Sequence, residues 1–234
     1  MIIKRDYYLK KIIDKRENGR IKIITGIRRC GKSYLLFNLY QEYLLSQGIK
    51  EEQIIAIALD EIDNLEYRNP FRLNEYIKKK TKNRNQMYYI FIDEIQLSEA
   101  VSNPYIDSKE KNVTFVDVLL GLMKRNNVDI YVTGSNSKML SSDVLTQFRD
   151  RGNEIHVNPL SFAEVYGLYE NKESAFEHYI VYGGMPYIYS LKSDEEKNQY
   201  LKDLFRETYL KDILERNNIQ NEKEVLELLL DFTS

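Results

Sequence analysis

The chain has 234 residues, a formal net charge of −2, 43% hydrophobic and 30% charged residues, and a single cysteine, Cys30. This length allows one large domain, or a core domain with a small second domain, because domains typically have about 100 to 200 residues. No uncharged run approaches the roughly 18 residues of a membrane helix, and the N-terminus lacks a secretory pattern. We therefore expect a cytoplasmic protein with no membrane partner, no internal disulfide and no global charge that demands nucleic acid.

Runs rich in β-branched residues alternate with helical patterns through the first two thirds of the chain. The runs predict strands at residues 21–25, 53–59, 87–92, 129–132 and 153–157. Apolar spacing predicts helices at residues 35–44, 72–80, 114–125 and 138–147, with Thr114 and Ser137 as N-caps. This alternation predicts a parallel sheet covered by helices on both faces.

The pattern becomes helical after residue 159. Residues 161–169, 172–182 and 195–216 read as helices, and Gly183-Gly184-Met185-Pro186 interrupts them. The sequence thus predicts a core over residues 1–159, followed at 160–234 by a helical lid and the start of a C-terminal region. The polar stretch 97–112 lacks periodicity and is predicted as a long loop near the functional site.

Residues 26–33 fit the pattern GxxxxGK[ST] at every fixed position, between a predicted strand and a predicted helix. Glycines let such a loop curl so that its N–H groups face a phosphate, and the helix adds the positive end of its dipole. The alternative is a mere glycine-rich turn, which the flanking strand and helix disfavour. We expect ATP and Mg²⁺ to bind here, with Lys32 on the β and γ phosphates and Ser33 on the metal. The predicted nucleotide-binding residues are Gly26, Ile27, Arg28, Arg29, Cys30, Gly31, Lys32, Ser33 and Tyr34.

Polar residues also follow two other predicted strands. Asp93 and Glu94 end the apolar run at 88–92, where Asp93 would orient Mg²⁺ through water and Glu94 would act as general base. The alternative is two acids that end a strand in solvent. After the fourth strand, Asn136 is favoured over Ser135 or Thr133 as a hydrogen-bond partner of the γ-phosphate or the attacking water, and a plain helix N-cap there is compatible with that role.

Other side chains leave two interpretations open. Arg149 and Arg151 are candidates for an arginine finger that reaches a neighbouring subunit, and a surface salt bridge with a nearby aspartate is the equal alternative. The basic run 78–84 contacts phosphates in one interpretation and is a solvated helix end in the favoured one. Cys30 is either a redox-sensitive thiol or, in the favoured interpretation, an incidental small residue.

Together these motifs resemble a known family, the prokaryotic AAA-type P-loop ATPases, in which an ATP-binding AAA domain precedes a conserved C-terminal domain of unknown function. The residues that carry the resemblance are 24–33, 91–96, 132–140, 159–162 and 183–186. It implies an α/β P-loop NTPase (AAA-like) fold with a parallel five-stranded sheet of order 5-1-4-3-2 and a C-terminal helical lid.

The resemblance also implies roles for particular residues. Asp93 and Glu94 would form the Walker B pair, the 135–136 region would be sensor 1, and Pro186 would lie in a lid segment near the adenine. A sensor 2 arginine has no clear counterpart in the lid. The family pattern further implies a C-terminal domain that follows these residues.

Three functions are compatible with these features. The favoured one is an ATPase module that hydrolyses ATP with Mg²⁺ to drive a conformational change, with self-association as a possible arrangement. The alternative is a slow-turnover nucleotide-dependent switch or regulatory scaffold. A P-loop kinase is disfavoured because no acceptor pocket is evident in the sequence. Whether a protein or DNA is the partner does not follow from the sequence.

Overall fold

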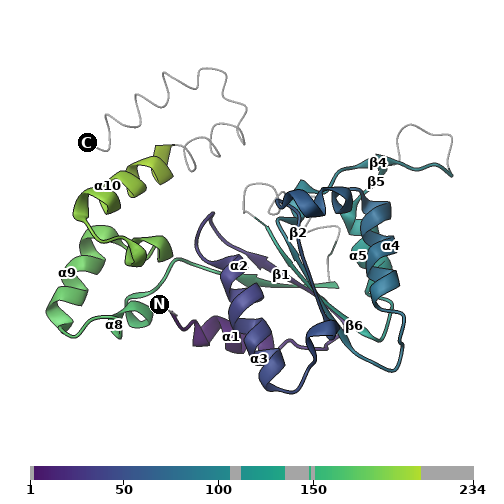
Figure 1. The fold of residues 1–234 in the computed structure, drawn as a ribbon, viewed down its shortest axis with the longest axis horizontal. Coiled ribbons are helices and arrows are strands. Elements are labelled where there is room, and N and C mark those ends of the chain that lie inside the picture. The colour runs from purple at the N-terminus through teal and green to yellow at the C-terminus, as the bar shows by residue number, and fades with distance from the viewer. Residues whose placement is uncertain (1–2, 106–111, 135–147, 149–150, 207–234) are drawn as a thin grey trace. The chain divides into compact units, whose positions relative to one another are not determined.

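The computed structural model describes residues 3–105, 112–134, 148 and 151–206. The chain divides into two compact units, drawn in Figure 1. The first, called the sheet unit, comprises Lys4–Ile27 and Gly31–Val157. The second, called the helical unit, comprises Met1–Ile3, Arg28–Cys30 and Asn158–Ser234. The predicted boundary between residues 159 and 160 stays a prediction.

A parallel five-stranded sheet forms the centre of the sheet unit. Its strands are β1 (Ile21–Thr25), β2 (Ile54–Ala58), β3 (Tyr88–Asp93), β6 (Val128–Thr133) and β7 (Gly152–His156). They lie in the order β2-β3-β6-β1-β7, and all pairs are parallel. Counted within this sheet alone, that order is the predicted 5-1-4-3-2. The labels differ because a separate hairpin, β4 (Val101–Ser102) with β5 (Asn112–Val113), interrupts the numbering.

One face of the sheet packs against α4 (Pro70–Lys80) and α5 (Phe115–Leu122), which lie side by side in Figure 1. Alternate strand residues such as Ile23, Ile90 and Ile130 join Leu73 and Leu119 in this core. Asn69 caps α4 by accepting from two backbone amides, and Thr114 with Asp117 forms a capping box on α5. The sequence therefore predicted these helices because apolar spacing and caps agree.

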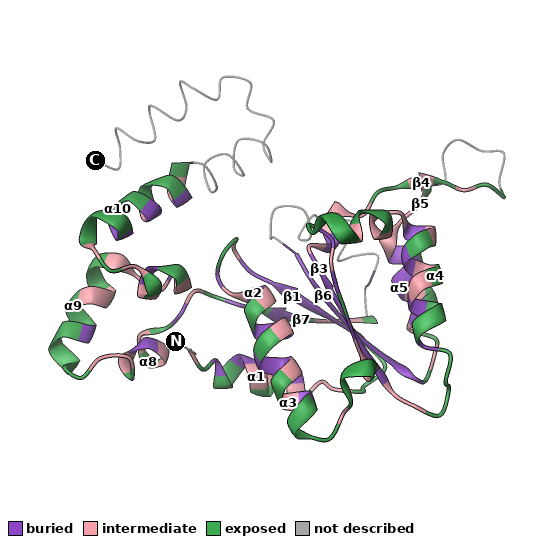
Figure 2. Cartoon of the chain, viewed as in Figure 1, coloured by how far each residue is buried: buried purple, intermediate pink, exposed green. Residues whose placement is uncertain are grey.

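The other face of the sheet packs against the helix that follows the P-loop. This helix runs through α2 (Lys32–Tyr34), the π-helical segment η1 (Leu35–Tyr40) and α3 (Gln41–Ser46), and α1 (Asp6–Ile13) packs beside η1. Tyr40 packs against Phe91 and Tyr131 of the sheet at ring-centroid distances of 5.7 and 4.9 Å. Both faces of β1, β3 and β6 are therefore buried, as the buried strands at the centre of Figure 2 show.

A buried ion pair joins the central strands on this second face. The Lys22 ammonium donates to Asp129, and the two side chains are 0% and 2% exposed. Asp129 also accepts from the Tyr131 hydroxyl at 2.6 Å, and Tyr131 shares a hydrogen bond of 2.6 Å with the Tyr40 hydroxyl. Burial lowers the pKa of Lys22, although Asp129 opposes this shift.

Short helical turns connect these elements. They are the 3₁₀ helices η2 (Glu51–Gln53), η3 (Ile62–Arg68) and η4 (Ile95–Leu97). The last of them follows β3 directly and belongs to the candidate site.

The helical unit contains α8 (Phe162–Tyr166), α9 (Lys172–Tyr182), the 3₁₀ helix η6 (Pro186–Ser190) and α10 (Asp194–Asp203). Between α9 and η6, Gly183 adopts φ of 69° and Gly184 lies against the backbone of Leu160. The Gly184 carbonyl accepts from the Leu160 amide at 2.7 Å. A Cβ on Gly184 would lie 1.9 Å from the Leu160 carbonyl oxygen, so only glycine fits there.

Most predicted elements of the described chain are present, with ends shifted by one to a few residues. The helix predicted at 161–169 instead ends at Tyr166, where Gly167 follows. The helix predicted at 195–216 is present as α10 up to Asp203 and continues in π-helical form to Arg206, and its predicted remainder lies outside the described residues. The helix predicted at 138–147 also lies outside the described residues. Sequence patterns missed α1, the hairpin and the 3₁₀ helices, which are short or fall in segments with weak periodicity.

Candidate functional site

The candidate site lies at the carboxyl edge of the sheet, where β1, β6 and β3 end next to one another. The register pairs Ile24 of β1 with Thr133 of β6, and Val132 of β6 with Ile92 of β3. Thr133 therefore lies between the end of β1, where the P-loop begins, and Asp93 at the end of β3. Ligands of open parallel sheets bind at such carboxyl edges.

The P-loop leaves β1 with backbone angles that favour glycine. Gly26 has φ of 148° and Gly31 has φ of 96°. A side chain at either position would strain the backbone, because L-residues rarely adopt these angles. The two fixed glycines of the motif are thus required by the turn itself.

Lys32 lies folded into the turn. Its side chain is 4% exposed, and its ammonium donates to the Gly26 carbonyl at 3.0 Å and to the Ile27 carbonyl at 2.9 Å. Ser33 follows on the first turn of α2, half-buried, and Tyr34 is exposed. The Lys32 ammonium is placed to exchange these two carbonyl acceptors for phosphate oxygens. Phosphate oxygens are the stronger hydrogen-bond acceptors because they are charged.

Asp93 and Glu94 share one partner, Thr133. The Thr133 hydroxyl donates to the Asp93 carboxylate, and the Glu94 amide donates to the same hydroxyl oxygen at 3.3 Å. Asp93 is 7% exposed. Sequence reasoning ranked Thr133 behind Asn136 because register between distant strands cannot be read from one sequence, so this link was missed.

Gln96 holds the carboxylate of Glu94. Its side-chain amide nitrogen donates to Glu94 Oε2 across the short turn η4. The other atom of that amide, Gln96 Oε1, is buried and has no hydrogen-bond partner among the described residues. The two-residue spacing is the only feature of the sequence that relates to this contact. A buried acceptor without a partner is uncommon in folded proteins and marks a place where a donor is needed.

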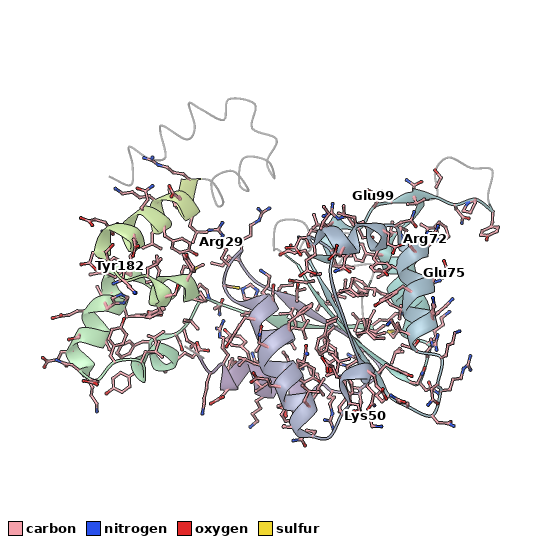
Figure 3. All side chains as sticks on the ribbon, in the orientation of Figure 1. Arg29, Lys50, Arg72, Glu75, Glu99 and Tyr182 are labelled. Atoms are coloured by element: carbon pink, nitrogen blue, oxygen red, sulfur yellow. The ribbon has the colours of Figure 1, made fainter. Side chains whose placement is uncertain are left out.

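Other predicted residues belong to the helical unit. Arg28, Arg29 and Cys30 form the tip of the P-loop, and the Arg29 guanidinium lies 5.8 Å from the centroid of the Tyr200 ring. Figure 3 labels Arg29 on the loop that follows β1. Cys30 is buried, and Pro186 begins η6. Their predicted nucleotide contacts stay predictions.

The predicted sensor and finger residues divide into two groups. Asn136 and Arg149 lie outside the described residues. Arg151 is exposed and directly precedes β7, and Gly152 pairs with Ile21 at the start of β1. Five residues of strand at about 3.3 Å each separate it from the P-loop, so Arg151 does not reach the P-loop of its own chain. A role toward a neighbouring subunit stays a prediction.

Two family models match this chain, and the first covers most of the sheet unit. Residues 18–166 match a family model described as an AAA domain. The chain belongs to the AAA domain family. The AAA domain assignment agrees with the sheet order and makes the chain an ATPase-like P-loop module. Residues 173–233 match a second model, which is described as a domain of unknown function.

Relatives of this AAA domain protein occur in bacteria and archaea. An uncharacterized protein of Haemophilus influenzae is 30% identical over 228 residues, which covers 94% of this chain and 52% of the relative. An uncharacterized protein of Methanocaldococcus jannaschii is 30% identical over 246 residues, covering 96% of this chain and 47% of the relative. The chain thus spans about half the length of these curated relatives.

Among solved structures, the Walker-type ATPase of Pyrococcus abyssi is similar to this chain with a TM-score of 0.49 and 16% identity. The match covers 100% of this chain and 77% of that one. No helix within the described part of the chain has the length and apolar character to cross a membrane.

Proposed function

We propose that this chain binds ATP with Mg²⁺ at the P-loop and hydrolyses it. The observation that carries the proposal is the buried Lys32 ammonium, curled into the loop at the same sheet edge as Asp93 and Thr133. ATP would bring phosphate oxygens that replace the loop carbonyls as acceptors. Membership in the AAA domain family supports this assignment of ligand.

The residues at the edge suit in-line attack by water on the γ-phosphorus. Ser33 and Asp93 would hold Mg²⁺, with Asp93 acting through water, and the metal would neutralise charge on the β and γ oxygens. Water forms the new bond to phosphorus, the bond to the β-γ bridging oxygen breaks, and the products are ADP and inorganic phosphate. Glu94 would accept the proton of the attacking water.

Gln96 would help to position that water. Its amide nitrogen fixes one oxygen of Glu94, and its unpartnered Oε1 needs a donor. A water molecule has two protons and can donate one to Gln96 and one to the free oxygen of Glu94. This arrangement would orient the lone pair of the water away from both acceptors, toward a phosphate in the P-loop.

A slow nucleotide-dependent switch is the second candidate. The chain passes from the sheet unit into the helical unit and back within the P-loop itself, because Arg28–Cys30 belong to the helical unit. We propose that residues 160–234 serve as the lid that responds.

The first test is ligand-dependent thermal stabilisation. MgATP at about 100 times its Kd should stabilise the wild-type protein by about 2.7 kcal/mol. Lys32→Ala should lose this shift because the phosphate charge loses its partner. Lys10→Ala, at an exposed position on α1, should keep it. An equal shift in all three proteins would refute the P-loop assignment.

Phosphate release then separates the two candidates. If the chain is an ATPase, Glu94→Gln should lower steady-state release by at least about a hundredfold while the thermal shift remains, because general-base removal costs about 10²–10⁴ in rate. Equal and negligible release by both proteins would favour the switch. Phosphate found only on an added acceptor would favour a kinase.

A further inference from the structure

A strongly basic surface lies at the amino edge of the sheet, opposite the edge that carries the P-loop. Seven residues form it, five from the end of α4 and the turn after it, and two from the turn after α5. They are Lys78, Lys79, Lys80, Lys82, Arg84, Lys124 and Arg125, and we call them the basic surface. All are exposed except Arg125, which is half-buried.

The fold holds the two contributing segments together. Arg125 Nη2 donates to the Thr81 carbonyl at 2.5 Å, and Asn127 Nδ2 donates to the Asn83 carbonyl at 3.1 Å. The Tyr88 amide donates to the Asn127 carbonyl at 3.0 Å where β3 begins. Residues 44 positions apart in the sequence thus meet through several hydrogen bonds. The sequence shows only the run at 78–84 and gives no sign that Lys124 and Arg125 lie beside it.

A hollow of about 320 Å³ opens between the two segments. It is lined by Arg84, Lys124, Arg125, Asn126 and Asn127, with no acid among these described lining residues. Guanidinium, ammonium and amide groups are the side-chain donors that most often contact phosphate oxygens in nucleic-acid complexes. The lining is therefore suited to a phosphate group.

The two segments that form this surface contain no acidic residue. Residues 78–86 and 123–127 contain its seven basic residues and no aspartate or glutamate. The nearest acid along α4 is Glu75, and it is paired with Arg72 at 3.5 Å (Figure 3). Glu51 and Glu52 line a second hollow near the start of β2 together with Lys80, so these acids lie near one end of the basic surface and do not line the hollow beside Arg84. The net charge of −2 for the whole chain thus conceals a local excess of positive charge.

We propose that the basic surface binds the phosphate backbone of a double-stranded nucleic acid without sequence specificity. A duplex is favoured over a single strand because no aromatic residue is among the described residues that line the hollow, and single-strand sites rely on aromatic stacking. A nucleic acid is favoured over an acidic peptide because the arginines and asparagines around the hollow suit phosphate. This surface is independent of ATP, because strands of about 20 Å separate it from the P-loop edge.

The test measures binding of a short fluorescent DNA duplex by anisotropy across a range of salt concentrations, with circular dichroism to confirm folding. Wild-type affinity should fall steeply with salt, because bound phosphates release counterions. Lys82→Glu/Arg84→Glu should weaken binding by at least about tenfold and reduce the slope of log affinity against log salt by about 2, or about 0.9 for each lost phosphate contact. Arg125 is left intact, since it also holds Thr81.

The matched control is Lys4→Glu/Lys10→Glu, which makes the same change in net charge at exposed positions at and before α1. It should bind the duplex like the wild type. Equal loss in both double variants, or an unchanged slope in Lys82→Glu/Arg84→Glu, would overturn the proposal. A glutamate-rich peptide of matched charge that binds as tightly as the duplex would overturn it in favour of an acidic protein partner. ATPase activity plays no part in these outcomes.

Discussion

Glu94 has a backbone conformation that few residues of its type adopt, with φ of 50° and ψ of 46°. A left-handed conformation costs roughly 1–2 kcal/mol for a residue with a side chain, so the surroundings must hold it. Thr133 does so by accepting from the Glu94 amide, and Gln96 does so by donating to its carboxylate. Strain that contacts maintain at the end of a strand is typical of functional sites.

Replacing Gln96 with glutamate tests its positioning role. Gln96→Glu keeps the size of the side chain, but it removes the amide donor to Glu94 and places a second carboxylate beside it, so repulsion should move the Glu94 carboxylate away from the attacking water. Turnover should therefore fall by at least about tenfold, whereas the KM for ATP should change little. The readout is the profile of phosphate release against ATP concentration.

Gln47→Glu makes the same change at an exposed residue after α3 and serves as the control. If both variants keep the wild-type profile while Glu94→Gln is inactive, Gln96 has no part in positioning. If the wild type itself releases no phosphate, the proposed hydrolysis fails first.

At this scale the sequence singles out candidate residues for the site but does not show their contacts. The glycines and Lys32 follow from a motif whose geometry is local, so one chain segment specifies it. The link from Thr133 to Asp93 depends on the pairing of β6 with β3, and strand register is set by the whole core. The hydrogen bond from Gln96 depends on a 3₁₀ turn that leaves no periodic signal.

The connection between α9 and η6 shows how one element can depend on a single glycine. The carbonyl of Gly184 accepts from the Leu160 amide at 2.7 Å, which joins this turn to the segment before α8. The sequence predicted only that Gly183, Gly184 and Pro186 break a helix, because sequence alone cannot show which distant backbone approaches. Elements with strong periodicity or caps, such as α4 and α9, were predicted accurately.

Gly184→Ala should therefore destabilise the helical unit. The new Cβ would lie 1.9 Å from the Leu160 oxygen, and the backbone would have to move. Such overpacking typically costs about 1–3 kcal/mol. Gly167→Ala is the matched control, because a Cβ there meets nothing within 4 Å and its φ is −71°. Urea midpoints should fall for the first variant alone, and equal midpoints would contradict the close approach.

For the whole molecule, buried phenols link stability to pH. Burial raises the pKa of Tyr40, Tyr89 and Tyr131 above the ordinary value of 10.0. Above pH 10 the unfolded chain loses these protons while the folded chain keeps them, so the folded state binds more protons and the free energy of unfolding falls as pH rises. Lys22 acts in the opposite sense because its pKa is lowered.

The three tyrosines lower the free energy of unfolding as the pH rises, and Lys22 alone raises it. The tyrosines should therefore dominate, and the urea midpoint should decline from pH 10 upward. Each excess proton contributes about 1.4 kcal/mol per pH unit. Tyr131→Phe should be less stable at neutral pH, because Asp129 loses a donor, yet it should show a shallower decline with pH. The measurement is a series of urea titrations with tyrosine ionisation followed by absorbance. A slope equal to that of the wild type would show that Tyr131 does not contribute.

The place of β1 in the sheet has a consequence for how the chain is made. Ile21–Thr25 leaves the ribosome well before both of its neighbours, β6 and β7, which begin only at Val128 and Gly152. Because synthesis adds about 5–20 residues per second, this apolar strand has no partner strand on either edge for several seconds. Newly synthesised chains are consequently most vulnerable to aggregation before residue 156 emerges, and chaperones that shield extended apolar segments would act in that interval.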